Sequence, residues 1–160
     1  MGASRKGRGR YGLYVIGAAA GREPRYGRCV MAGRVFFFLQ HATYEPAFQA
    51  ATMGITAAAM GDEVYFVFAF DALRLLVRGA YGEPATGREQ EEAARAESLG
   101  VLAPARMLAE ARSLGARLIA CDTTVRICGF EPEALSGTLD EVMGMASLWR
   151  MTDGARILTL

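Results

Sequence analysis

Residues 35–39 read Val-Phe-Phe-Phe-Leu, a continuous apolar run of residues that favour β-structure. A run without alternating polar residues is typical of a central parallel strand that is covered on both faces. Residues 63–70 contain a second such run, Val-Tyr-Phe-Val-Phe at 64–68. The two runs predict two buried strands, which need a helical crossover between them if they are parallel.

The segment between the two runs has the features of that crossover helix. Residues 43–60 are rich in Ala and Met, with apolar residues at helical spacing. Pro46 suits a first helical turn, and Gly61 suits the left-handed position just past the end. Residues 71–78 predict a second, short helix that Asp71 can cap.

The C-terminal half repeats the alternation of strand and helix. Residues 105–114 predict an amphipathic helix whose inward side chains are Met107, Leu108, Ala111 and Leu114. Residues 117–121 predict a third strand, 122–128 a short helix, and 156–160 a last strand. Thr138 and Glu141 match a capping box, which predicts a helix from there to residue 153. Alternating strands and helices predict an α/β fold, with a mostly parallel sheet and helices on both faces.

Composition limits the class of protein. The chain has 160 residues, which suits one domain, and 52% of them are hydrophobic, enough for a sizeable core. No apolar run approaches the ~20 residues that cross a bilayer, so we expect no membrane association. Three cysteines are few and odd in number, which favours a reducing, cytoplasmic setting.

Charge divides the chain in two. Residues 1–30 carry seven Lys and Arg against one Glu, and residues 31–160 carry eleven against sixteen Asp and Glu. The acidic body gives no support for nucleic-acid binding. We interpret residues 1–30 as a basic and apolar extension that is dispensable, and residues 31–160 as the folded domain. A secretory signal, a structured strand and a nucleic-acid arm are the alternatives for the extension.

Residues 79–104 interrupt the alternation. They open with Gly-Ala-Tyr-Gly-Glu-Pro and continue as a charged stretch over residues 89–95. Such a run of charged residues usually forms the solvent-exposed face of a helix. The alternative is a mobile flap over a site.

Ligands of open parallel sheets bind beyond the carboxyl ends of the strands. Cys121 ends the third strand, and Asp122, Thr123 and Thr124 follow at the start of a helix. Backbone N–H groups there favour an anion, so the position can stabilise a reactive thiolate. The alternative is a buried cysteine that acts as a small apolar residue.

The other candidate groups give weaker signals. Cys128 lies two helical turns from Cys121, too far for a disulfide, and is expected in the core. His41 and Thr43 follow the first strand, and His41 is either a proton partner of Cys121 or an exposed loop residue. One histidine cannot build a typical zinc site, and no glycine-rich phosphate loop follows a strand. We therefore expect no metal and no cofactor.

Residues 118–130, Leu-Ile-Ala-Cys-Asp-Thr-Thr-Val-Arg-Ile-Cys-Gly-Phe, resemble the active-cysteine segment of the DsrE/DsrF-like family. There a strand ends in Ala-Cys and leads into a short helix, followed by Gly and an apolar residue. Residues 133–135 and 145–160, the first strand, its helix and the entry to the second strand are also similar, so the resemblance covers residues 33–160. In one subgroup the segment reads Cys-x-x-Ser-Met-x-x-Met-Gly, from which this chain departs at Thr124, Val125 and Cys128.

The resemblance implies a three-layer α/β/α domain with about five strands, and a homo-oligomer. It also implies sulfur relay, in which Cys121 carries a persulfide between a donor and an acceptor protein. Asp122, Thr123, Thr124, His41 and Thr43 are the expected substrate-binding residues. A flap of residues 79–103 is expected to cover the mouth of this site, and whether such a carrier turns over as an enzyme is left open.

Two other functions stay open. The first is an oligomeric ligand-binding or assembly module of the same fold, without covalent chemistry. The eight Met, eight Phe and single Trp in a short chain favour it, because they imply buried subunit surface. The second is a thiol redox protein, for which Cys128 is poorly placed as the resolving cysteine.

Overall fold

The two phenylalanine-rich runs form neighbouring strands at the centre of the fold. The computed structural model describes residues 32–160, where β1 (Arg34–Leu39) pairs in parallel with β2 (Glu63–Phe68). Phe37 lies opposite Phe66, and the two rings stack with centroids 5.2 Å apart. Such side-by-side aromatic pairs stabilise adjacent strands.

Three further strands extend the sheet from this pair. β3 (Arg117–Cys121) pairs with β2, β4 (Glu141–Met143) pairs with β3, and β5 (Arg156–Thr159) pairs with β1. The order is β4-β3-β2-β1-β5, and every pair is parallel. The α/β fold class predicted from the sequence is confirmed.

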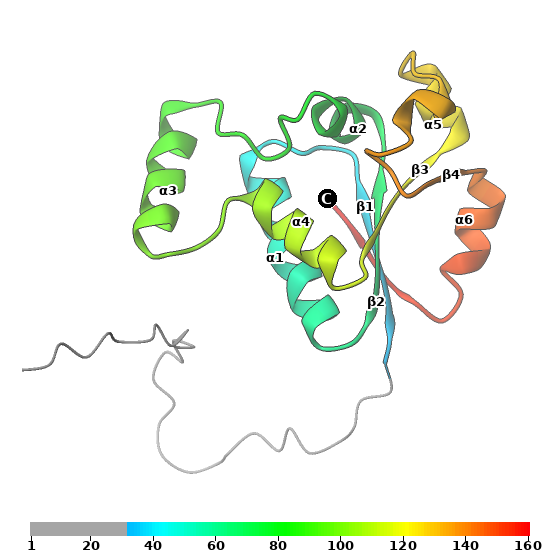
Figure 1. Cartoon of the computed structure of the whole chain (residues 1–160), viewed down its shortest axis with the longest axis horizontal. Helices are drawn as coiled ribbons and strands as arrows, with labels where there is room; N and C mark the ends of the chain where they lie inside the picture. Colours follow the sequence, from blue (N-terminus) through cyan, green and yellow to red (C-terminus); the bar gives the residue numbers. More distant parts are fainter. Residues whose placement is uncertain (1–31) are drawn as a thin grey trace, which may run out of the picture.

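Helices cover the two faces of the sheet unequally (Figure 1). α1 and α4 lie on one face and α6 lies on the other. The helices are α1 (Tyr44–Ala59), α2 (Phe70–Val77), α3 (Gly87–Ser98), α4 (Pro104–Ser113), α5 (Asp122–Ile127) and α6 (Met145–Met151), with a 3₁₀ turn, η1, at Pro132–Leu135. The predicted helices at 43–60, 105–114 and 122–128 are present within one or two residues.

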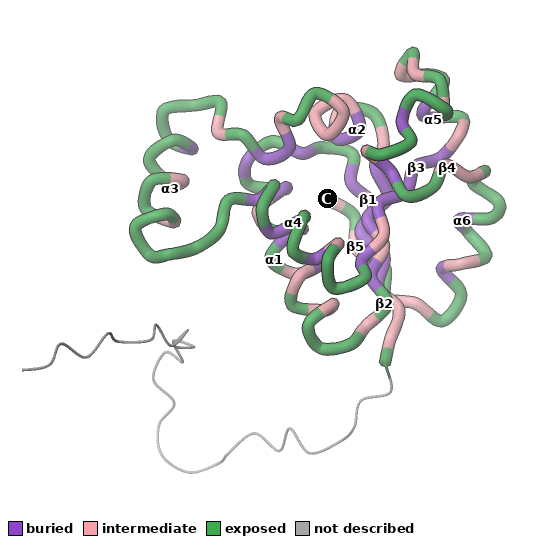
Figure 2. The backbone as a smooth tube through the Cα atoms, in the orientation of Figure 1, coloured by how far each residue is buried: buried purple, intermediate pink, exposed green. Residues whose placement is uncertain are grey.

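The apolar core is divided by the sheet into a large and a small part. The large part lies beneath α1 and α4 and includes Phe37, Phe66 and Met107. The small part beneath α6 contains five buried residues: Phe36, Val67, Ile119, Cys121 and Leu148. Figure 2 shows the burial concentrated in the central strands, while α3 and α6 are largely exposed. α6 is therefore a thin third layer.

Right-handed crossovers explain this arrangement. From β1 to β2, β3 and β4 the chain steps in one direction along the sheet, and α1, α2, α4 and α5 of these connections pack with the large core. From β4 to β5 it returns in the opposite direction, so its connection must lie on the other face. That connection is α6.

Three sequence predictions are wrong in detail. Thr138 does not begin a helix: residues 141–143 form β4, and α6 starts only at Met145. Asp71 does not cap α2, whose N-cap is Ala69. Leu114 is the C-cap of α4 and is 53% exposed rather than inward.

The predictions for residues 1–30 lie outside the described residues. Of the predicted domain over 31–160, the structure describes residues 32–160. None of the helices in this part has both the length and the apolar character needed to cross a bilayer.

Gly54 allows α1 to approach the sheet. A Cβ atom there would lie 2.1 Å from Cζ of Phe66, a distance that real contacts do not reach. We expect Gly54→Ala to destabilise the protein by about 1–3 kcal/mol, because overpacking outweighs the ~1 kcal/mol gain in helix propensity. Urea denaturation would measure the change.

Gly87→Ala is the matched control, since Gly87 also lies in a helix but has no neighbouring atom within 4 Å of the added Cβ. An unchanged or raised stability of Gly54→Ala would show that α1 and β2 are not packed as described.

Candidate functional site

The connections after β3 and β4 leave the sheet towards opposite faces. β3 continues into α5, whose Val125 belongs to the large core, whereas β4 continues into α6 on the small-core face. β3 and β4 are neighbouring parallel strands, with Cys121 opposite Met143 at their carboxyl ends. A divergence of this kind is the topological switch point at which open α/β sheets bind their ligands. Cys121 lies at that point.

The Cys121 side chain is buried. The residue is 4% exposed, and its side chain belongs to the small core with Ile119 and Leu148 of α6. Met143 packs against the same cluster. In this conformation the thiol is therefore largely shielded from a second molecule.

The residues after Cys121 form the first turn of α5. Cys121 is the N-cap of this helix and makes no side-chain capping hydrogen bond. Thr123 is exposed, and Thr124 is buried. Asp122 accepts a hydrogen bond from Nε of Arg126 at 3.1 Å, which raises the pKa of the guanidinium. The negative charge of Asp122, which would oppose a thiolate at Cys121, is thus partly balanced by Arg126.

Asp140 holds β4 beside β3. Its backbone N–H donates to the carbonyl oxygen of Leu118 at 2.7 Å, and its carboxylate accepts from the Leu118 N–H at 2.8 Å. Arg112 of α4 also donates to this carboxylate. This carboxylate thus adds to the backbone pairing that places the short strand at one side of the switch point.

A residue with a strained backbone begins α2, just after the strand next to β3. Phe70 follows β2 with a φ of +45°, a conformation that bulky residues seldom adopt. Its ring is 45% exposed, and its carbonyl oxygen lies 3.8 Å from Sγ of Cys128. Backbone strain of this kind costs about 1–3 kcal/mol and is found most often at active sites and ligand-binding sites.

His41 and Thr43 lie at the same sheet edge but farther away. Both are exposed, and Thr43 is the N-cap of α1. β2 lies between β1 and β3, and two strand spacings amount to about 10 Å. No hydrogen bond within residues 32–160 joins His41 to Cys121. The alternative of an exposed loop histidine describes His41 in this structure.

The expected flap does not cover Cys121. Within residues 79–103, α3 lies at the opposite end of the molecule from α5 and α6 (Figure 1). The cavity beneath it is lined by residues such as Tyr44, Pro84 and Leu102. The prediction that this segment closes over the cysteine is therefore wrong.

Cys128 and Cys121 lie on different sides of the sheet. Cys128 packs against the large core and Cys121 lies within the small one, and both thiols are free. Cys29 lies outside the described residues. Among residues 32–160, no three His, Cys, Asp or Glu side chains are grouped to hold a metal ion.

Sequence reasoning missed Met143, Asp140 and Phe70. Met143 and Asp140 were assigned to a helix because the Thr-x-x-Glu pattern resembles a cap. The left-handed backbone of Phe70 has no sequence signal, since glycine or asparagine is the usual residue there.

Comparison with known proteins leaves the family open. No protein-family model matches the chain, and a search of curated proteins gives no significant match. The fold and the switch point therefore carry the functional argument.

Removing the Asp140 carboxylate should loosen the switch point. We expect Asp140→Ala to lower the free energy of unfolding by about 1–3 kcal/mol, because the Leu118 N–H loses its partner. The native protein should also alkylate faster at Cys121, since β4, which carries Met143 opposite Cys121, is held less tightly. Chemical denaturation and mass-resolved alkylation measure the two effects.

Asp153→Ala is the control, because the exposed Asp153 carboxylate makes no ion pair within the described residues. Equal alkylation rates at Cys121 in the two variants would contradict this role of Asp140.

Proposed function

We propose that the protein relays sulfur, carrying it as a persulfide on Cys121. The observation that carries the proposal is the position of Cys121 at the carboxyl end of β3, where the connections of β3 and β4 diverge. The resemblance of residues 118–130 to the active-cysteine segment of the DsrE/DsrF-like family supports the same residue. A carrier of this kind works in a reducing compartment, which we propose to be the cytoplasm.

The chemistry needs only a thiolate. The Cys121 thiolate attacks the outer sulfur of a donor persulfide, R–S–SH, and the S–S bond of the donor breaks. The donor leaves as a thiolate, and Cys121 becomes a persulfide. An acceptor thiolate removes the sulfur by the same reaction, so no net oxidation occurs and no cofactor or metal is needed.

Burial suits a carrier that protects its cargo. A persulfide at Cys121 would lie among apolar side chains, away from water and from small thiols. α6 is a suitable cover because it has seven residues and only Leu148 of them is buried. Arg34 donates to the carbonyl oxygen of Met151 at 3.1 Å, which holds the far end of α6. Docking of a partner would displace the near end.

The other site residues have separate parts in this proposal. Thr123 and Thr124 belong to the first turn of α5, where backbone N–H groups favour the thiolate. Asp122 orients Arg126. His41 and Thr43, exposed on the same edge beyond β2, contact the donor or acceptor protein rather than the sulfur.

Persulfide loading is the direct test. The full chain is incubated with glutathione persulfide, and intact mass and peptide mapping locate any added sulfur. We expect one sulfur atom on Cys121, lost in Cys121→Ser and retained in Cys128→Ser, because Cys121, unlike Cys128, lies at the switch point.

Absence of an adduct would contradict the proposal. So would an adduct in Cys121→Ser at the level of the unsubstituted protein. Alkylation of Cys121 in the native protein, measured against the unfolded chain, provides an independent estimate of access to the thiol.

A second proposal concerns assembly and holds with or without sulfur chemistry. Around α6 the molecule exposes apolar side chains: Met145 is 50% exposed, Trp149 67% and Ile157 47%. Ile157 of β5 pairs with Phe36, so it lies on the sheet face that α6 covers thinly. We propose that a second copy of the chain covers this face, as the predicted homo-oligomer requires.

Trp149 reports this contact directly, because the chain has one Trp. On dilution we expect the emission of Trp149 to shift to longer wavelength as the dimer dissociates into monomers that expose the indole. Ile157→Lys should give the shifted emission at all concentrations, because a lysine charge on the contact face opposes association.

Light scattering checks the mass, and Leu99→Lys, an exposed apolar residue away from this face, serves as control. A monomer at high micromolar concentration with constant emission would exclude the assembly.

A further inference from the structure

α3 stands apart from the rest of the domain. Of its twelve residues only Glu89 is buried, and Figure 2 shows the helix exposed along most of its length. The segments 78–86 and 99–103 connect it to α2 and α4. A helix without an apolar packing face needs other interactions to keep its place.

Polar contacts order the start of α3 and join it to α1. The Thr86 side chain accepts from the Glu89 N–H, and the Glu89 carboxylate accepts from the N–H groups of Thr86 and Ala85 at 2.8 and 3.0 Å. These bonds lower the pKa of Glu89. Arg88 bridges to Glu45 of α1 at 2.7 Å. The start of α3 is therefore capped by its own residues and joined to α1 by one exposed ion pair.

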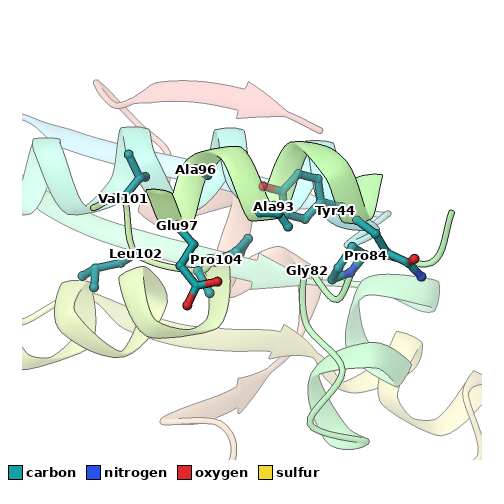
Figure 3. Close-up of a pocket in the computed structure, with 12 residues that line it drawn as sticks. Tyr44, Gly82, Pro84, Ala93, Ala96, Glu97, Val101, Leu102 and Pro104 are labelled. Atoms are coloured by element: carbon teal, nitrogen blue, oxygen red, sulfur yellow. The ribbon is translucent and has the colours of Figure 1, made fainter. Parts of the chain in front are cut away.

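A cavity of about 540 Å³ lies beneath α3 (Figure 3). Its volume falls within the range of small-molecule sites. The walls are mainly apolar and come from α3, the two connecting segments and the start of α1. They include Tyr44, Pro84, Ala93, Leu102 and Pro104.

One carboxylate lies on the solvent-exposed side of this cavity without an ion-pair partner in the described residues: Glu97 is an exposed residue of α3 that also lines the cavity. Figure 3 shows the Glu97 side chain extending towards Pro104, between Leu102 and Pro84. Within residues 32–160, Glu97 makes no ion pair, whereas the two arginines of α3 do: Arg88 pairs with Glu45 and Glu92, and Arg95 with Glu91.

The other charged residues of α3 add to the negative charge of Glu97 at this cavity. The helix contains four glutamates and two arginines, so its net charge is −2. An apolar cavity with one unpaired carboxylate on its solvent-exposed side, carried by a negative helix, attracts a cation and repels an anion.

We propose that this cavity binds a small organic cation: an apolar body, aromatic or aliphatic, with one ammonium group. The ammonium group pairs with Glu97, and the body packs against Ala93, Leu102 and Pro104. Tyr44 closes the inner end, where burial raises the pKa of its phenol and keeps it uncharged. This site is separate from Cys121, so it holds whether or not the protein relays sulfur.

Three naphthalene probes test the charge preference: 1-naphthylethylamine as the cation, 1-naphthylacetamide as the neutral form and 1-naphthylacetate as the anion. Isothermal titration calorimetry on the full chain measures each. For ligands of this size we expect a dissociation constant of about 1 mM or tighter for the amine. The amide should bind about three- to tenfold more weakly, and the acetate more weakly still.

Variants test the location. Glu97→Gln should remove the preference for the amine over the amide. Glu110→Gln, which removes an exposed carboxylate of α4 outside the cavity, should keep it. Ala93→Phe fills the cavity and should weaken binding of all three probes by about tenfold or more. Leu102→Ala removes part of one wall and should weaken binding of all three probes by about threefold. Because Leu102 is 45% exposed, we expect little effect on stability.

Two results would overturn the proposal. One is equal binding of the amine and the acetate, or a preference for the amine that survives in Glu97→Gln. The other is the absence of saturable amine binding at about ten times the expected dissociation constant. Circular dichroism of each variant confirms that the helices are retained.

Discussion

The central strands β1 and β2 present apolar side chains to both faces of the sheet, and the positions of the other elements follow from the need to cover them. Phe37 and Phe66 face one side, and Phe36 and Val67 face the other. A parallel pair buried in this way requires a helix for each crossover, and right-handedness decides the face on which each helix lies. The three crossovers that lead to β4 cover one face, so only the return to β5 remains to cover the other.

That division also produces the candidate site. Because the return begins at β4, the chain leaves β3 and β4 in opposite directions, and Cys121 ends on the seam between them. The same order of strands leaves only one seven-residue helix, α6, to cover the second face, which explains why Trp149 and Ile157 are exposed there. The candidate site and the exposed apolar face are thus two results of one topology.

Most elements could be predicted from the sequence because their signals are local. The strand 117–121 was predicted with the bounds of β3, and α1 begins and ends within one residue of its prediction. The order of the strands has no local signal. For that reason the sequence placed His41 near Cys121, whereas β2 lies between their strands.

Two occurrences of one pattern show where local signals fail. Thr-x-x-Glu occurs at 86–89, where it is a true capping box, and at 138–141, where it is not. Before α3 no other partner competes for the Thr86 and Glu89 groups. At 139–140, Leu139 is buried, and Asp140 satisfies both backbone groups of Leu118 at the open edge of β3.

The burial of Leu139, together with the hydrogen bonds between Asp140 and Leu118, stabilises the strand by more than the ~1 kcal/mol that a helix cap would contribute. The competing partner lies 22 residues away in the chain, so no window around Thr138 contains it. The switch point includes β4, so the residues that form it depend on this tertiary contact and could not be predicted from local sequence. Cys121 could be predicted, because it ends a strand whose signal is local.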